Sequence, residues 1–163
     1  MSTMAANGNG GSPKGYARQV EYVTVTVDRQ LLGLPINRVH DVFVVSDMTS
    51  VPLASAEIAG LLNLRGRVVT AVSLRQRLRL PDRVGAERRM AVGLEHHGEA
   101  YGLLVDEVGE VLKLDPETLQ PNPVHLDPRW ASLSHGVHQL HGSLLIILNV
   151  DAVLAFETEK QAA

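Results

Sequence analysis

The chain has no cysteine and few aromatic residues, and these two absences exclude several classes of function. Without cysteine there is no disulfide, thiolate metal site, iron–sulfur cluster or thiol nucleophile. Aromatic side chains make up 4% of the 163 residues, too few for a surface that stacks on sugars or single-stranded nucleic acid. The net charge of −3 also argues against a polycationic nucleic-acid binder.

Long apolar runs and a secretory signal are missing as well. No stretch approaches the roughly 18 consecutive apolar residues that a transmembrane helix needs. Residues 1–18 are rich in glycine and small polar side chains and contain no apolar signal region, so we predict a disordered N-terminal arm. These features favour a cytoplasmic protein.

Catalytic motifs are also absent. The chain has no nucleophile elbow, phosphate-binding loop, dinucleotide fingerprint or H-E-x-x-H zinc motif. Asp106 and Glu107 end a predicted strand, where neighbouring side chains face opposite ways and make poor acid–base partners. His135, His138 and His141 recur every third residue, but at the period of a strand His138 faces away from the other two. The sequence favours a protein with no enzymatic activity and no cofactor; the alternative is a histidine-based metal-dependent enzyme.

Hydrophobic residues, mainly valine and leucine, make up 45% of the chain and occur in short runs separated by turn residues. Val23, Val25 and Val27 alternate with threonine, which is the period of a half-buried strand. Ser73 is predicted to cap a short helix that ends before Pro81, and residues 151–156 to form a C-terminal helix. By the same patterns we expect strands at 20–27, 31–35, 38–45, 61–72 with a turn at Gly66, 89–95, 100–105, 108–114, 137–140 and 144–150.

The segments between the expected strands are mostly turns and loops. His96 and His97 are predicted to form a polar hairpin turn, and Asp115 to cap a single turn that follows it. Residues 48–58 are expected to be a loop. Residues 120–129 contain three prolines and are expected to be extended.

The expected domain organisation follows from this spacing. Many short strands with regular turn signals are typical of barrels and sandwiches. We expect one domain at 19–157, divided into strand-rich halves at 19–83 and 84–157, and a polar tail at 158–163. A barrel of about sixty residues is marginal by itself, so the two halves should share a core.

Charge is distributed unevenly along the chain. Residues 65–89 contain eight arginines against Asp82 and Glu87, whereas residues 95–117 contain seven acidic residues against Lys113. This separation favours either docking of charged partners, including other copies of the chain, or two solvated faces that balance each other.

Five segments, taken in order, resemble the CheW-like adaptor domains of bacterial chemotaxis. The most specific is Asn63–Val69, followed by Val72–Arg75. The others are Leu32–Leu34 with Val39–Val42, Tyr101–Asp106 with Val108, Leu119–Pro121, and Leu144–Val150. The resemblance extends over nearly all of residues 20–156.

The resemblance implies a non-enzymatic scaffold of mostly β structure. Its fold would be two SH3-like five-stranded β-barrel subdomains with a shared hydrophobic core and short helices, one of them C-terminal. Its partners would be the histidine kinase CheA, the cytoplasmic tips of methyl-accepting chemoreceptors, and other CheW-like copies, without nucleic acid or membrane insertion. It would be cytoplasmic and recruited to membrane-associated receptor arrays. An adaptor of a non-flagellar chemosensory pathway, such as twitching motility, remains open.

The resemblance also implies an interaction site. Arg65 matches the motif arginine, and Asp41 matches an acidic residue, usually glutamate, that lies close enough to pair with it. Four valines would line a groove that receives a receptor helix tip, although each could equally be an ordinary core residue. The expected receptor and kinase contacts are Val39, Asp41, Asn63, Leu64, Arg65, Gly66, Val68, Gly102, Val105 and Val108.

Three positions depart from the family pattern. Ser73 replaces an aspartate, which should preserve the helix cap because both residues are good N-caps. Thr70 replaces a proline that many members have. Arg67 replaces an aliphatic residue and adds a charge beside the motif, which would alter partner preference.

Overall fold

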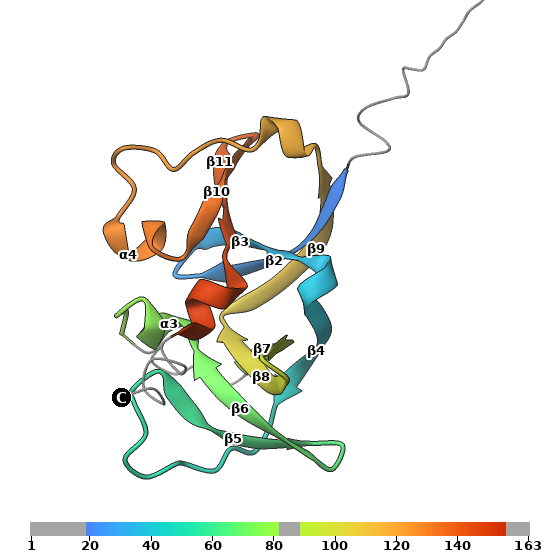
Figure 1. The fold of residues 1–163 in the computed structure, drawn as a ribbon, viewed down its shortest axis with the longest axis vertical. Coiled ribbons are helices and arrows are strands. Elements are labelled where there is room, and N and C mark those ends of the chain that lie inside the picture. Colours follow the sequence, from blue (N-terminus) through green and yellow to red (C-terminus); the bar gives the residue numbers. More distant parts are fainter. Residues whose placement is uncertain (1–18, 82–88, 156–163) are drawn as a thin grey trace, which may run out of the picture.

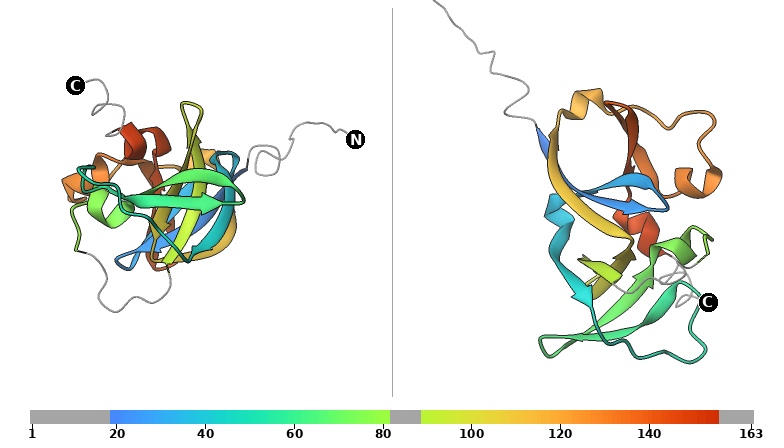
Figure 2. Two further views of the ribbon diagram at one scale, coloured as in Figure 1. Left: turned by 90° about the horizontal axis from the view of Figure 1, so that it is seen from below. Right: turned by 180° about the vertical axis from the view of Figure 1, so that it is seen from behind.

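The computed structural model describes residues 19–81 and 89–155, and its architecture is two packed β-sheets with short helices at their margins (Figures 1 and 2). The described residues form ten strands: β2 (Val20–Val27), β3 (Gln30–Pro35), β4 (Val39–Val45), β5 (Ile58–Leu64), β6 (Arg67–Ser73), β7 (Arg89–His96), β8 (Glu99–Val105), β9 (Glu107–Leu114), β10 (Ser134–Leu140) and β11 (Ser143–Leu148). The mostly β class predicted from the alternating apolar runs is confirmed.

Short helices occupy the connections between strands. They are η1 (Ile36–Arg38), α3 (Leu74–Arg77), η2 (Pro116–Thr118), α4 (Pro128–Ala131) and a C-terminal helical segment at 150–155. The predicted caps are present, because the Ser73 hydroxyl accepts from the Gln76 N–H and the Asp115 carboxylate accepts from the Glu117 N–H. None of the helices in the described ranges has the length and apolar character needed to cross a membrane.

The strands are divided between two five-stranded sheets. The first sheet has the order β10-β11-β3-β2-β9 and the second has the order β4-β7-β8-β6-β5. Most neighbouring strands are antiparallel, including four hairpins of consecutive strands, but β11 pairs with β3 and β6 pairs with β8 in parallel. The five-stranded count implied by the family resemblance is therefore confirmed, whereas closure of each sheet into a barrel stays a prediction.

The expected division of the chain into halves does not describe these sheets. The first sheet combines β2 and β3 with β9, β10 and β11, so it draws on both 19–83 and 84–157. The second sheet likewise takes β4 to β6 from one half and β7 and β8 from the other. Periodicity identifies a strand and its buried face but carries no information about its distant partner, which is why the division was wrong.

One apolar core joins the two sheets, as the sequence predicted. It includes Val25, Leu32 and Ile146 from the first sheet, all fully buried. It continues without interruption through side chains of the second sheet, α3 and the C-terminal helix. These include Val72, Leu74, Val92, Leu103 and Leu154.

A polar network reinforces the same junction. The Arg75 guanidinium of α3 donates to both oxygens of the Asp106 carboxylate, at 3.0 and 2.8 Å. Asp106 also accepts from the backbone N–H of Asp28, in the turn between β2 and β3, at 2.8 Å. One carboxylate therefore ties a helix beside the second sheet to a hairpin of the first sheet.

Three local predictions require correction. The strand predicted at 38–45 begins at Val39 instead, because Arg38 is the last residue of a 3-10 turn at 36–38 that follows Pro35. Residues 128–131 are helical rather than extended, because Pro128 occupies the first helical turn and the Asp127 carboxylate caps the Arg129 N–H. The C-terminal helix begins at 150, since the Asn149 side chain accepts from the Ala152 N–H.

His96 also differs from its predicted role as a polar turn residue. It is the last residue of β7 and is buried, with its Nδ1 3.2 Å from the Asp151 carboxylate. Asp151 accepts in addition from the Arg38 guanidinium at 3.0 Å. The hairpin, η1 and the C-terminal helix therefore meet at one carboxylate, and only His97 and Gly98 form the turn.

Candidate interaction site

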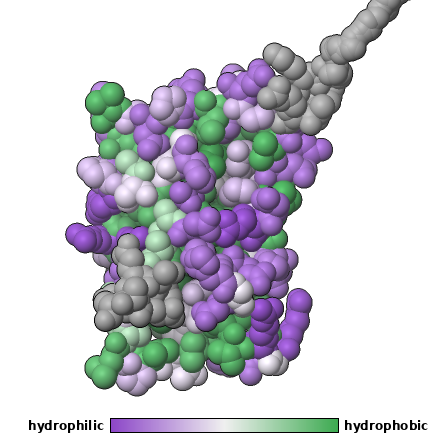
Figure 3. Space-filling view, viewed as in Figure 1, coloured by the Kyte–Doolittle hydropathy of each residue, from purple (hydrophilic) through white to green (hydrophobic). Residues whose placement is uncertain are grey.

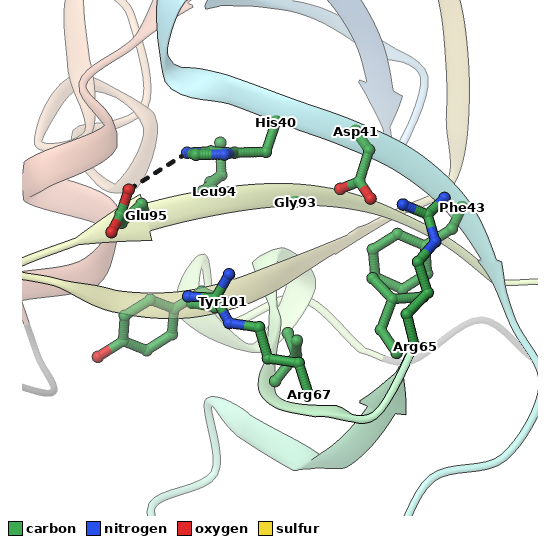
Figure 4. Close-up of a pocket in the computed structure, with 12 residues that line it drawn as sticks. His40, Asp41, Phe43, Arg65, Arg67, Gly93, Leu94, Glu95 and Tyr101 are labelled. Carbon is green, nitrogen blue, oxygen red and sulfur yellow. Dashed lines mark ion pairs between the residues drawn. The ribbon is translucent and has the colours of Figure 1, made fainter.

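A cavity of about 360 Å³ opens on the second sheet between β4, β7 and the β5–β6 turn. Its floor is apolar and its rim is charged, with guanidinium groups on one side and carboxylates on the other (Figure 4). Three of the predicted contact residues line it: Asp41, Leu64 and Arg65. The remaining lining residues are His40, Phe43, Arg67, Val69, Gly93, Leu94, Glu95, Ala100 and Tyr101.

The tight turn between β5 and β6 presents two arginines to this cavity. Arg65 and Gly66 both have positive φ, at 55° and 81°, as a two-residue hairpin turn that follows the strand twist requires. The Asn63 side chain accepts from the Gly66 N–H at 3.0 Å and fixes the turn. The predicted residues Asn63 and Gly66 therefore shape the loop, and Arg65 and Arg67 are the side chains that it places at the rim.

Asp41 reaches the cavity from the edge strand β4. The pairing of β4 with β7 is irregular between Val39 and Asp41, and beyond it Asp41 lies opposite Gly93. The Asp41 carboxylate lies directly over Gly93, where a β-carbon would overlap its Oδ1 atom. Glycine at position 93 therefore leaves the space that this carboxylate occupies.

The family resemblance implied that Asp41 lies close enough to Arg65 to pair with it, and the structure places both residues at the cavity. Both side chains line the cavity, and Figure 4 shows their charged ends over the same end of it. Within the described part of the chain, however, no ion pair of 4.0 Å or less joins them. The Asp41 side chain is one methylene shorter than the glutamate usual in the family and lies against β7.

At the opposite end of the cavity, His40 lies beside Glu95. His40 Nε2 lies 3.4 Å from a Glu95 oxygen, and both side chains are about half exposed. Nearby, the Tyr101 hydroxyl donates to Glu99 at 3.2 Å while its ring contributes to the cavity wall. The cavity can therefore accept a group that combines apolar and polar character, as protein recognition pockets do.

The four predicted groove valines are not gathered on one surface. Val105 is buried, and Val39 and Val108 are half-buried against the shared core. Val68 is 63% exposed and lies opposite Asn63 on the outward side of the hairpin. Among the four, only Val68 presents most of its side chain to a partner in this conformation.

Gly102 lies beside the cavity floor rather than on its surface. It pairs with Gly93 across β7 and β8. A β-carbon at Gly102 would lie 3.3 Å from the Phe43 ring and 3.5 Å from Val69. Gly102 therefore leaves room for the Phe43 ring, although less critically than Gly93 does for Asp41, and Asp41 and Phe43 lie two residues apart on β4.

The late histidines do not converge on a common point. His138 is buried, with Nδ1 3.1 Å from the Thr118 hydroxyl, while His135 and His141 are exposed. Burial lowers the pKa of His138 and favours its neutral form. Within residues 19–81 and 89–155, no three histidine or carboxylate side chains are grouped as metal ligands.

Sequence reasoning missed Gly93, Phe43 and Tyr101 as parts of this site. Phe43 and Tyr101 fall on predicted strands, but periodicity alone could not place them in one cavity. Gly93 interrupts an apolar strand, and an isolated glycine there is a recognised signal of close approach by another group. What approaches is Asp41, on a strand far away in the sequence.

The surface outside the cavity is divided by hydropathy. On the face shown in Figure 3, hydrophilic residues occupy the middle, and hydrophobic residues gather at the end where β5 and the preceding loop lie. Exposed apolar side chains of the second sheet and that loop are Val42, Val44, Leu53 and Val68.

Comparison with known protein families gives one match over most of the chain. The model of the CheW-like domain matches residues 21–157. This range includes both sheets, the cavity and the β5–β6 turn.

Individual relatives agree with the family match. The chemotaxis protein CheW of Rhizobium meliloti is 27% identical over 143 residues, which cover 88% of this chain and 92% of the relative. The CheW of Treponema pallidum is 26% identical over 141 residues, covering 81% and 80%. Among solved structures, the scaffolding protein TtCheW from Thermoanaerobacter tengcongensis superposes with a TM-score of 0.71 at 26% identity, covering 80% of this chain and 89% of that one.

Proposed function

Because this chain belongs to the CheW-like domain family, we propose that it is an adaptor that couples the cytoplasmic tips of chemoreceptors to the histidine kinase CheA. The supporting observation is the family match over residues 21–157, together with a related solved structure described as a scaffolding protein. This is a class of proteins that act by binding rather than by catalysis. The proposed place of action is the cytoplasmic side of membrane-associated receptor arrays.

The geometry of the second sheet fits such a binding role. The β5–β6 turn projects two guanidinium groups, which can bind carboxylates through paired hydrogen bonds. Next to them, the cavity offers apolar area for the side chain of a partner. We keep as proposed contacts the residues named from the sequence, with Asp41, Leu64, Arg65 and the exposed Val68 as those the structure presents most directly.

The members of the set that are buried, or that form the turn, have a different proposed role. Val105 and Gly102 are buried, and Asn63 and Gly66 form the turn. In the adaptor they would act by holding the contact surface in shape. Val39 and Val108 are half-buried against the shared core, so a partner would contact only the parts of these side chains that remain exposed.

A co-sedimentation experiment tests this function. Wild-type protein is mixed with receptor-containing membranes and CheA, and its retention in the pellet is measured. Replacement of Arg65 by glutamate should reduce retention about tenfold or more, as loss of a central interface arginine does. Arg29→Glu is the matched control, because Arg29 is also exposed in a tight β-turn with φ of 68° but belongs to the first sheet.

Failure of the wild-type protein to be retained by either partner would refute the adaptor function. An equal loss for Arg29→Glu and Arg65→Glu would show that charge alone governs retention and would remove Arg65 from the site. The identity of the retained kinase also assigns the pathway. A kinase from a twitching-motility system would favour the non-flagellar alternative.

A further inference from the structure

We infer that Gly93 is a positioning residue: because it has no β-carbon, it leaves the space in which the Asp41 carboxylate lies at the rim of the cavity, and it thereby contributes to partner binding. The inference rests on the proposed adaptor function, which makes this cavity part of the contact surface. It adds a residue that neither the motifs of the sequence nor the expected contacts included.

The geometry around Gly93 explains why no side chain is present there. A β-carbon at this position would overlap the Asp41 Oδ1 atom, whereas its next contacts, Asp41 Cγ and the Asp41 carbonyl oxygen, would be at ordinary distances of 3.4 and 3.5 Å. Gly93 is also not among the residues of the described chain with positive φ. The backbone therefore tolerates a side chain at this position, and the obstacle is the carboxylate alone.

The Asp41 carboxylate in this position remains available to a partner. Asp41 is half-buried in β4 and, among the described residues, has no ion pair of 4.0 Å or less. It shares the cavity with the guanidinium groups of Arg65 and Arg67. The carboxylate and the two neighbouring arginines together present acceptors and donors, so they can recognise a polar group of the partner by its arrangement of charge.

Gly93→Ala should move this carboxylate without unfolding the protein. Only the tip of the Asp41 side chain has to move, and it can rotate toward solvent. We expect retention by receptor membranes and CheA to decrease about tenfold, as for Asp41→Ala. The Asp41 carboxyl carbon should also shift in the ¹³C NMR spectrum of the free protein.

Two further variants separate positioning from a general effect of an added methyl group. Gly33→Ala is the matched control, since a β-carbon there would lie 3.0 Å from the flexible end of Ile147 in the first sheet, away from the cavity. The double variant Asp41→Ala, Gly93→Ala removes the carboxylate that the new methyl group would displace. It should fold and bind no worse than Asp41→Ala alone.

The results of these experiments decide whether Gly93 positions Asp41 or whether an added methyl group has only a general effect. The inference is overturned if Gly93→Ala binds like the wild type, if it weakens binding further in the Asp41→Ala background, or if the Asp41 carboxyl signal does not move. It is also overturned if Asp41→Ala binds normally or if the double variant fails to fold. Absence of binding by the wild type would instead overturn the adaptor function, and the NMR measurement would still test the positioning of Asp41.

Discussion

At the scale of single residues, the contact between Arg75 and Asp106 is a close, half-buried polar link between the two sheets. Their side chains are only 15% and 13% exposed, and the guanidinium holds the carboxylate through two hydrogen bonds. We predict that Arg75→Ala lowers the free energy of unfolding by about 2–3 kcal/mol, because it removes two charge-assisted hydrogen bonds to a half-buried carboxylate. Urea denaturation measures this change.

Arg129→Ala provides the comparison for that experiment. Arg129 also binds a carboxylate closely, with 2.7 Å between its guanidinium and Asp127, but this pair is exposed to solvent. Loss of an exposed pair should leave the urea midpoint nearly unchanged. Equal destabilisation by the two variants would contradict the argument from burial.

Asp151 supplies a prediction of pH dependence. The hydrogen bond from Arg38 is the main cause that lowers the pKa of Asp151, and His96 adds to the effect. Because the native pKa lies below the unfolded value of about 3.9, the contribution of Asp151 to stability is complete above that pH. It should disappear as the pH falls through the lower native pKa. Asp151→Asn should therefore flatten the loss of stability below about pH 4, as measured by urea denaturation at several pH values.

Single residues of the site were only partly predictable from sequence. The turn motif identified Arg65 and the residues that shape its loop, because a two-residue turn is a local property. Gly93 and the contact of His96 with Asp151 depend on strands and helices that are distant in sequence. Local sequence patterns carry no information about such contacts between distant segments.

At the scale of elements, α3 shows how a short helix depends on its cap. It has only four residues, and the Ser73 hydroxyl accepts from the Gln76 N–H at 3.2 Å. We predict that Ser73→Ala lowers the free energy of unfolding by about 1 kcal/mol, whereas Ser73→Asp retains it. Thermal or urea denaturation distinguishes the two variants, and equal stability of both would contradict the capping role.

Elements were predicted well where periodicity and turn residues agree. The alternation of valine and threonine in β2 and the serine before α3 are local signals, and both led to the observed structure. The helical turns at 36–38 and 128–131 were missed because each is only one turn long and follows a proline-containing segment. Such segments give no repeating apolar pattern that could identify a helix.

At the scale of the whole molecule, the shared core should make the two sheets unfold together. Trp130, the only tryptophan, packs against this core from α4 and reports on its integrity. We predict that urea transitions followed by tryptophan fluorescence and by far-ultraviolet circular dichroism coincide. Leu103→Ala, in the second sheet, should move both transitions equally and lower stability by about 2–5 kcal/mol. Two separate transitions would show that the sheets are independent.

The sequence predicted the shared core because a unit of about sixty residues buries too little apolar surface to be more than marginally stable alone. It did not predict which strands belong to which sheet. The parallel pairing of β11 with β3 joins segments from opposite ends of the chain, and apolar runs of similar composition could have paired in other ways. Strand partnership is thus decided by packing of the complete chain rather than by local preference.

The order of strands has a consequence for how such a protein can be altered. The second sheet is formed by consecutive strands, β4 to β8, whereas the first sheet is completed by strands that precede and follow them. Every residue that lines the cavity therefore lies in one continuous segment between His40 and Tyr101. Exchange of that segment between relatives requires only two junctions and replaces every residue that lines the cavity, while the first sheet stays unchanged. Under the proposed function, partner preference would then change with this one segment, provided that the new segment keeps the core residues that pack against the first sheet.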